Sequence, residues 1–144
     1  MSKNPYFKYK ETQVLSASRE QILLLMYEAA IKFTKLAIKS AEEGKIVERC
    51  TNLGRAFDIV MELNNTLDHS IGGEISINLE RLYMFITDQY TKANLTGDPE
   101  PLRISLKILE TLYDGWKQAV QQLKKDGLHT TATSNKNATE KQEE

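Results

Sequence analysis

The sequence predicts an all-α protein, an antiparallel four-helix bundle with up-down-up-down topology. Two observations predict this fold. Apolar residues recur at alternating steps of three and four, the spacing of a single helix face, over four long stretches of the chain. Proline, the strongest helix breaker, occurs only at positions 5, 99 and 101, so most of the chain is free to form long helices.

The first helix is predicted to begin after Ser18. The Ser18 hydroxyl can accept a hydrogen bond from the backbone amide of Gln21, and the Gln21 side chain can bond the backbone of Ser18 in return, which is a capping box. The face predicted to pack against the other helices is formed by Ile22, Met26, Ala29, Phe33, Leu36 and Ser40.

The second and third helices repeat this spacing without a break, as is typical of the seam between antiparallel helices. The second carries Ile46, Cys50, Leu53, Phe57, Val60, Asn64 and Leu67, and the third carries Ile75, Leu79, Leu82, Ile86, Gln89 and Ala93. Cys50 is therefore expected to be an inert thiol in the core. Asn64 is either a buried polar group that fixes the helix register or a side chain that faces a partner.

The fourth helix is predicted to begin at an Asp98 cap, with Pro99 in its first turn. Its face is formed by Leu102, Ser105, Leu109, Leu112, Trp116, Ala119 and Leu123. The predicted connections, near Gly44, near Gly72-Gly73 and at residues 96–99, are short, and short connections between long helices make neighbouring helices antiparallel.

We expect one structured domain, the bundle of residues 18–125, between two segments of different character. Residues 126–144 contain almost no apolar side chains and are predicted to form a disordered tail. Residues 1–17 include Tyr6, Phe7 and Tyr9, which make this segment too apolar for a solvated arm. It is therefore predicted to be a short capping segment that packs on another surface.

The charge balance argues against two classes of partner. Nineteen Lys and Arg residues face 20 Asp and Glu residues, so the net charge of −1 creates no field that attracts nucleic acid or anionic lipid. The longest aliphatic run, residues 22–26, is far too short to enter a membrane as a spanning helix. A single cysteine and the lack of an apolar signal region favour a cytoplasmic location.

The residues offer little material for catalysis, a metal or a cofactor, and we expect none of the three. The histidines are His69 and His129, and Thr66 stands where a di-iron bundle would need a glutamate before His69. A histidine phosphotransfer bundle that uses His69 is the alternative function. The simpler interpretation places His69 in the last turn of the second helix, where the helix dipole favours a cation.

The helices carry more apolar residues than one seam each requires. On the first helix, the additional residues are Leu23, Leu24, Tyr27, Ala30, Ile31 and Ile38. Such a surplus indicates grooves that stay open on the surface and accept partner helices. For this groove we predict, on the second and third helices, Ile59, Leu63, Ile75, Leu79, Tyr83 and Ile86.

Two alternatives to this groove stay open. Ile75, Leu79 and Ile86 also lie on the predicted seam, so they can equally belong to the core. A structural oligomer that uses the surplus stripes for self-assembly is also compatible with the pattern.

Three segments in the correct order resemble the FliS family of flagellar secretion chaperones. The segment ASREQILLLMYEAAIKF (17–33) resembles the opening helix of the family, and ELNNTLDHSIGGEISINLERLYMFI (62–86) resembles its second-to-third helix junction. The segment LKILETLYDGWKQAV (106–120) is similar to its final helix. The likeness spans about residues 5–123, with departures at Arg19, where the family usually has Pro, and at Glu28-Ala29, where it has Asp-Gly.

The resemblance implies a non-enzymatic cytoplasmic chaperone. Members of the family bind the disordered C-terminal segment of flagellin, prevent its premature polymerisation and help deliver it to the gate of the flagellar type III export apparatus. The expected partners are therefore the flagellin C-terminal region and an export gate component. The resemblance also implies that the N-terminal segment covers part of the bundle and moves aside for the client, which assigns client contacts to Tyr6 and Tyr9.

Overall fold

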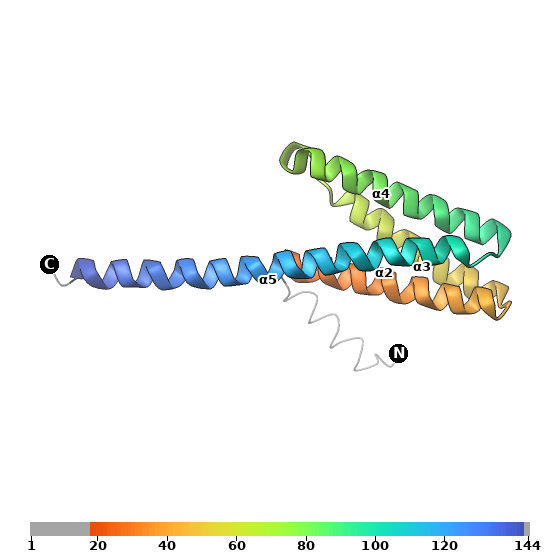
Figure 1. Ribbon diagram of the computed structural model, residues 1–144, viewed down its shortest axis with the longest axis horizontal. Helices are drawn as coiled ribbons and strands as arrows, with labels where there is room; N and C mark the ends of the chain where they lie inside the picture. The colour runs from red at the N-terminus through yellow and green to blue at the C-terminus, as the bar shows by residue number, and fades with distance from the viewer. Residues whose placement is uncertain (1–17, 143–144) are drawn as a thin grey trace, which may run out of the picture. The chain divides into compact units, whose positions relative to one another are not determined.

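A computed structural model describes residues 18–142 of the chain, with side chains described as far as Asp126. These residues form α2 (Arg19–Glu42), α3 (Ile46–Asn65), α4 (His69–Thr96) and α5 (Glu100–Gln142), as Figure 1 shows, and they contain no strand. The predicted all-α four-helix bundle is confirmed. No helix in this part of the chain is both long enough and apolar enough to cross a membrane.

The described residues divide after Tyr113 into two compact units, so residues 100–113 of α5 belong to the unit that contains α2, α3 and α4, and the rest of α5 belongs to a separate unit. α5 continues as a helix beyond residue 125, where the sequence places the end of the bundle. The division into bundle and tail stays a prediction. The predicted capping segment, residues 1–17, lies outside the described residues.

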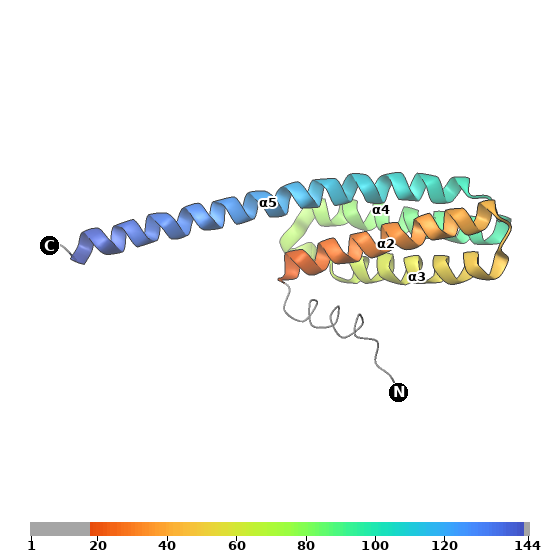
Figure 2. The ribbon, with the colours of Figure 1, turned by 90° about the horizontal axis from the view of Figure 1, so that it is seen from below.

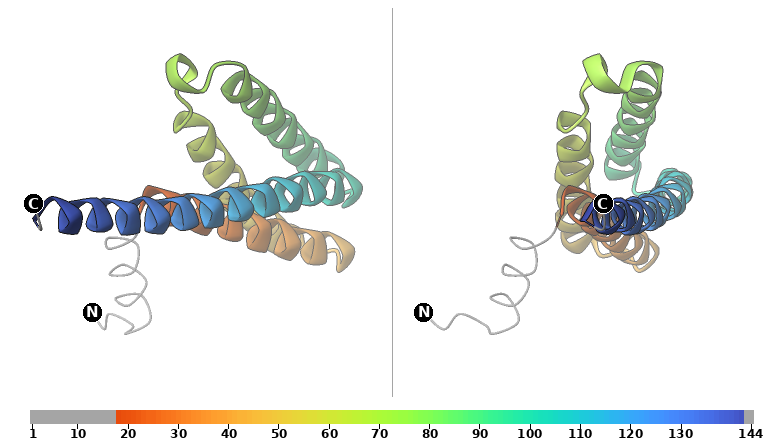
Figure 3. Two further views of the ribbon diagram at one scale, coloured as in Figure 1. Left: turned by 60° about the vertical axis from the view of Figure 1, so that its left-hand side comes forward. Right: turned by 90° about the vertical axis from the view of Figure 1, so that its left-hand side faces the viewer.

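Hydrogen bonds between helices define the direction of each element in the bundle. Two buried pairs join α2 to α4, Tyr27 with Tyr83 and Thr34 with Tyr90, and the partners in each pair are 56 residues apart. This constant offset means that α2 and α4 run parallel. Because α3 packs beside both of them and runs in the opposite direction, the up-down-up-down topology follows (Figures 2 and 3).

Local signals set most helix ends. The Ser18 hydroxyl accepts a hydrogen bond from the Gln21 amide, and the Gln21 side chain accepts one from the Ser18 amide, so the predicted capping box is confirmed. The Asp98 carboxylate accepts a hydrogen bond of 3.0 Å from the amide of Glu100 at the start of α5. Gly97 ends α4 with a φ of 76°, a left-handed conformation that favours glycine.

The predicted junction at Gly72-Gly73 is correct in that helical geometry is interrupted at Gly73, but the connection from α3 begins earlier. The chain connects α3 to α4 at residues 66–68, because the Asp68 carboxylate accepts a hydrogen bond from the Ser70 amide and starts the next helix there. Gly73 makes a kink inside α4, with φ 54° and ψ −128°. His69 is consequently the first residue of α4, so the interpretation of His69 as a cation at a helix C-terminus is wrong.

The buried face of α2 differs from the predicted one. Its buried residues are Tyr27, Ala30, Thr34, Ala37 and Ser40, whereas all the other predicted seam residues stay half-buried or exposed. The hydroxyls are satisfied inside the helix, because Thr34 donates to the Ala30 carbonyl at 2.7 Å and Ser40 donates to the Leu36 carbonyl at 2.9 Å. Small side chains of this kind let neighbouring helices approach closely, which explains why this stripe takes the core.

On α3 the predicted seam is correct for Leu53 and Val60 but wrong for Ile46 and Cys50. The helix buries Leu53, Ala56, Val60 and Leu63, while Ile46 is 62% exposed. Cys50 is exposed rather than in the core, and its thiol donates a hydrogen bond of 3.2 Å to the Asn94 side chain.

The side-chain carbonyl of Asn64 forms no hydrogen bond with a described residue that would fix the helix register. Asn64 is half-buried, and its Oδ1 atom is shielded from solvent without a hydrogen-bond partner among the described residues.

Candidate functional site

The bundle buries small and large residues together and still leaves several large apolar residues on its surface. The core includes Ala30, Ala37, Ala56 and Ala93 together with five buried hydroxyl residues, Thr34, Ser40, Ser76, Thr87 and Ser105. In the bundle, the large apolar side chains that stay exposed include Ile46, Val47, Ile71, Ile75, Ile77, Met84, Phe85, Leu95 and Ile104. These exposed side chains are the feature that a binding surface requires, because burying apolar surface against a partner is favourable.

One apolar hollow lies between α3 and α4, and we call it the α3–α4 groove. It encloses about 280 Å³ and is lined by Cys50, Leu53, Gly54, Phe57, Tyr90, Thr91, Asn94 and Leu95. Leu95 is 83% exposed, so the groove is accessible from solvent. Gly54 leaves open space, since a Cβ atom at this position would meet no atom within 4 Å.

A second apolar surface follows one face of α4 after its kink, and we call it the α4 stripe. Ile75, Leu82 and Phe85 are spaced by seven and three residues, which places them on the same side of the helix. Ile75 is 70% exposed and Phe85 is 42% exposed, while Leu82 is half-buried. The stripe and the groove belong to the same pair of helices that the sequence analysis selected.

Most of the predicted groove residues lie elsewhere. Leu63 and Ile86 are fully buried, and Leu79 and Tyr83 are 8% and 2% exposed, so these four residues form the core and the prediction of an open groove is wrong for them. On α3 and α4 the buried stripe lies directly beside the exposed stripe. Residues of the buried stripe were therefore assigned to the open groove.

The other predicted contacts are placed differently. Ile59 is half-buried, and Ile75, in the α4 stripe, is largely exposed. Tyr6 and Tyr9 lie outside the described residues. The sequence analysis missed Gly54 and Leu95, although a glycine in the middle of a long helix is itself a signal that space is needed there.

His69 is held by two side chains across the kink in α4. Its Nδ1 atom lies 2.8 Å from the Ser76 hydroxyl, and its Nε2 atom pairs with the Glu80 carboxylate. Both ring nitrogens are therefore occupied, and neither is free to accept a phosphoryl group. This geometry does not favour the phosphotransfer alternative.

The two tyrosines that link α4 to α2 are structural. Burial raises the pKa of Tyr83, and the neighbouring Tyr27 adds to the effect. Burial also raises the pKa of Tyr90, against a smaller opposing effect of its hydrogen bond with Thr34. Both phenols stay protonated at neutral pH and act as hydrogen-bonding groups in the core.

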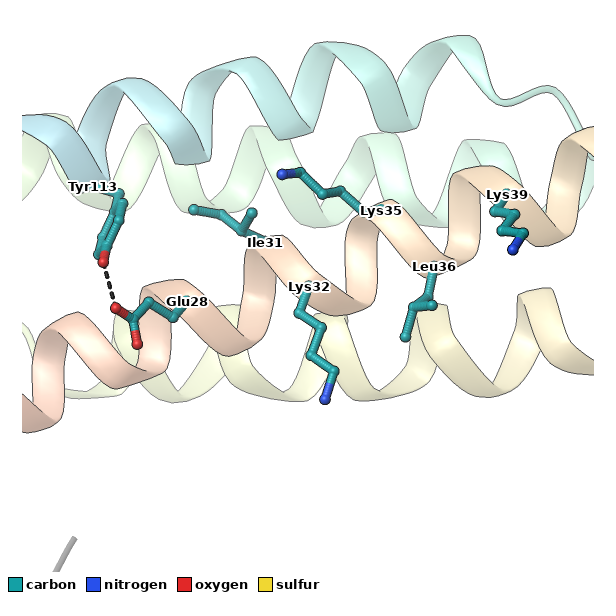
Figure 4. A pocket seen from close by; sticks show the side chains of 7 residues that line it. All are labelled: Glu28, Ile31, Lys32, Lys35, Leu36, Lys39 and Tyr113. Atoms are coloured by element: carbon teal, nitrogen blue, oxygen red, sulfur yellow. Dashed lines mark hydrogen bonds between the residues drawn. The ribbon is translucent and has the colours of Figure 1, made fainter. Parts of the chain in front are cut away.

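A second hollow lies between α2 and the first half of α5, and we call it the α2–α5 hollow. It encloses about 490 Å³ and is lined by Glu28, Ile31, Lys32, Lys35, Leu36, Lys39 and Tyr113, which Figure 4 shows from close by. The Tyr113 hydroxyl donates a hydrogen bond to the Glu28 carboxylate at one end of the hollow. Unlike the α3–α4 groove, this hollow has a charged rim.

Comparison with known proteins identifies the family. The chain matches the family described as Flagellar protein FliS over residues 2–123. It is 31% identical over 123 residues to the flagellar secretion chaperone FliS of Bacillus subtilis, and the aligned region covers 85% of this chain and 91% of that protein. It is also 31% identical over 108 residues to the flagellar secretion chaperone FliS of Vibrio cholerae, with coverage of 75% and 79%.

A solved structure supports the fold. The crystal structure of a flagellar chaperone from bacteria matches with a TM-score of 0.68 at 19% sequence identity, covering 81% of this chain and 95% of that one. Together with the sequence matches, these findings show that the chain belongs to the FliS family of flagellar secretion chaperones and is a chaperone rather than an enzyme.

Proposed function

We propose that this protein binds the disordered C-terminal segment of flagellin in the cytoplasm, prevents its premature polymerisation and helps to deliver it to the flagellar export gate. Family membership and the relatives' description as flagellar secretion chaperones support this role. The observation that carries the proposal is the number of large apolar side chains that stay exposed along α3 and α4.

The α3–α4 groove and the α4 stripe suit an amphipathic helix as occupant. Such a helix docks through apolar side chains spaced at i, i+3, i+4 and i+7, that is, over about two turns. From Cys50 to Phe57 the groove follows α3 for the same two turns, about 10 Å. The open space at Gly54 accepts one large side chain of the client.

A client that becomes ordered only on binding needs a large contact area. Coupled folding and binding typically costs about 2 to 5 kcal/mol or more in ordering, which is recovered by burying about 1,000 to 3,000 Å². The groove alone is too small for this area, so we propose that the client segment continues from the groove along the α4 stripe. Covering the apolar faces of the client prevents self-association without catalysis or a nucleotide.

We further propose that residues 1–17 cover part of this surface until the client arrives, with Tyr6 and Tyr9 as contacts. The apolar character of this segment supports the proposal. Exposed side chains such as Leu95 and Ile75 explain why a cover is useful, because uncovered apolar surface promotes self-association.

The experiment that tests the proposal is co-purification with flagellin. Full-length flagellin is expected to bind, whereas flagellin that lacks its last few dozen residues is expected to lose binding. Equal binding of both forms contradicts the proposal. Sedimentation without client tests the oligomer alternative, since a structural oligomer shows a mass that rises with concentration even when flagellin is absent.

A further inference from the structure

The α2–α5 hollow is held open by contacts at both of its ends. At one end Tyr113 donates a hydrogen bond to Glu28, and beyond the other end Arg103 pairs with Glu42 at 2.8 Å. Glu28 and Glu42 are 14 residues apart, which is about 21 Å along a helix. The contacts therefore fix α2 antiparallel to the first part of α5. The lining of the hollow on α2 runs from Glu28 to Lys39, about 16 Å, which makes a trough long enough for about three turns of a third helix.

The trough combines an apolar floor with a basic rim. Ile31 is half-buried and points toward α5 in Figure 4, so it forms the floor between the two helices together with the half-buried Tyr113. The rim on α2 consists of the exposed residues Lys32, Lys35 and Lys39, which lie between Ile31 and Leu36 around the helix. Their spacing of three and four residues aligns the three lysines along one edge of the helix.

The charges of this rim are not neutralised within the bundle. None of Lys32, Lys35 and Lys39 has a carboxylate within 4.0 Å in the part of the chain that the structure describes, and the one acid that lines the hollow, Glu28, bonds Tyr113. Since the whole chain has a net charge of −1, this cluster is a local feature and not part of a general positive surface.

We propose that the α2–α5 hollow docks an amphipathic helix with acidic flanks from a partner protein other than the flagellin client. Acidic side chains spaced by three and four residues pair with Lys32, Lys35 and Lys39, while the apolar face of the same helix covers Ile31 and Tyr113. The narrow trough favours a helix over a lipid surface or nucleic acid, which are bound by broad basic patches.

Two synthetic helical peptides with the same apolar face test the proposal, one flanked by glutamates and the other by lysines. Fluorescence anisotropy with the full-length protein is expected to show that the glutamate peptide binds about tenfold more tightly than the lysine peptide, because it forms three exposed ion pairs. The triple variant K32E/K35E/K39E should reverse this preference. The variant R81E/K92E/K124E, which changes the same net charge at exposed positions outside the hollow, should keep it.

Further measurements separate this site from other binding modes. Ile31→Asp should abolish binding of the glutamate peptide without loss of helical circular dichroism, since Ile31 is only half-buried. Equal affinity for both peptides, or an equal loss in the two triple variants, overturns the proposal. Lysine-dependent binding to vesicles of equimolar phosphatidylcholine and phosphatidylglycerol, without peptide binding, assigns the surface to lipid instead.

Flagellin binding distinguishes the hollow from the proposed client surface. K32E/K35E/K39E should co-purify with full-length flagellin as the unmodified protein does. Loss of flagellin in this variant alone shows that the hollow belongs to the client site, and the proposal of a separate acidic partner is then wrong.

Discussion

Inside the bundle the phenol of Tyr90 on α4 donates a hydrogen bond of 2.6 Å to the hydroxyl oxygen of Thr34 on α2. Tyr90 is the donor because the Thr34 hydroxyl gives its own proton to the carbonyl of Ala30. Both side chains are fully or almost fully buried. A bond of this kind fixes the register of two helices that are distant in sequence, and it requires a protonated phenol.

The protein is expected to lose stability in alkali through Tyr83 and Tyr90. Burial raises the pKa of each phenol above the ordinary value of 10.0, so the unfolded chain releases these protons at lower pH than the folded one. Their contribution is fully present below pH 10 and falls above it, by about 1.4 kcal/mol per pH unit and group. Urea unfolding between pH 8 and 12 measures the slope, which Tyr90→Phe should reduce. A flat profile above pH 10 contradicts the assignment.

Two leucine substitutions should separate the core from the client surface. Leu63→Glu places a charge in a fully buried position and should destabilise the bundle by about 4 kcal/mol or more, enough to unfold it. Leu95→Glu changes a residue that is 83% exposed, so the melting temperature should stay close to that of the unmodified protein while flagellin binding falls. Thermal melting and co-purification measure the two effects. A folded Leu63→Glu variant contradicts the burial of this side chain.

Replacing two glycines by alanine should have opposite effects on stability. Gly73→Ala forces a residue with a Cβ atom into φ 54° and ψ −128°, which should cost about 1 to 3 kcal/mol. Gly54→Ala adds a methyl group into open space within a helix and should stabilise by about 1 kcal/mol. Chemical denaturation checks both values. Equal effects of the two changes are incompatible with the kink at Gly73.

A larger side chain at Gly54 should block the α3–α4 groove. The Cβ atom of Gly54→Leu meets no atom within 4 Å, and the rest of the side chain extends into the space proposed for the client, so flagellin affinity should fall about tenfold or more. Gly115→Leu is the matched control, because it makes the same helix-favouring change at a position that does not line the groove. Calorimetric titration with a flagellin C-terminal peptide compares the variants. The same affinity for both places the client elsewhere.

The proposed cover can be tested with Tyr6→Ala combined with Tyr9→Ala. If residues 1–17 compete with the client for the groove, this double variant should bind flagellin more tightly or self-associate more readily, with unchanged helix content. Calorimetry, sedimentation and circular dichroism measure the three properties. Unchanged affinity together with unchanged sedimentation removes the N-terminal segment from the mechanism.

The sequence by itself determined the local structure and the family. Proline positions, apolar spacing and the Ser18 and Asp98 caps depend only on neighbouring residues, so the four helices and their order followed from them. The break at Gly73 was predicted correctly, whereas the earlier start of α4 was not, because the Asp68 cap begins a helical turn before the glycines.

Only the tertiary structure decided which stripe of each helix is inside. On α2 one stripe contains Met26 and Phe33, and the neighbouring stripe contains Tyr27 and Thr34. The two stripes are shifted by one residue, which is about 100° of rotation around the helix. Hydropathy favours the first stripe. The second is buried because hydroxyls satisfied by carbonyls of the preceding turn behave as small side chains and permit close packing. The same choice on α3 and α4 buries Leu63 and Ile86 and leaves Leu95 and its neighbours outside, where a client can reach them.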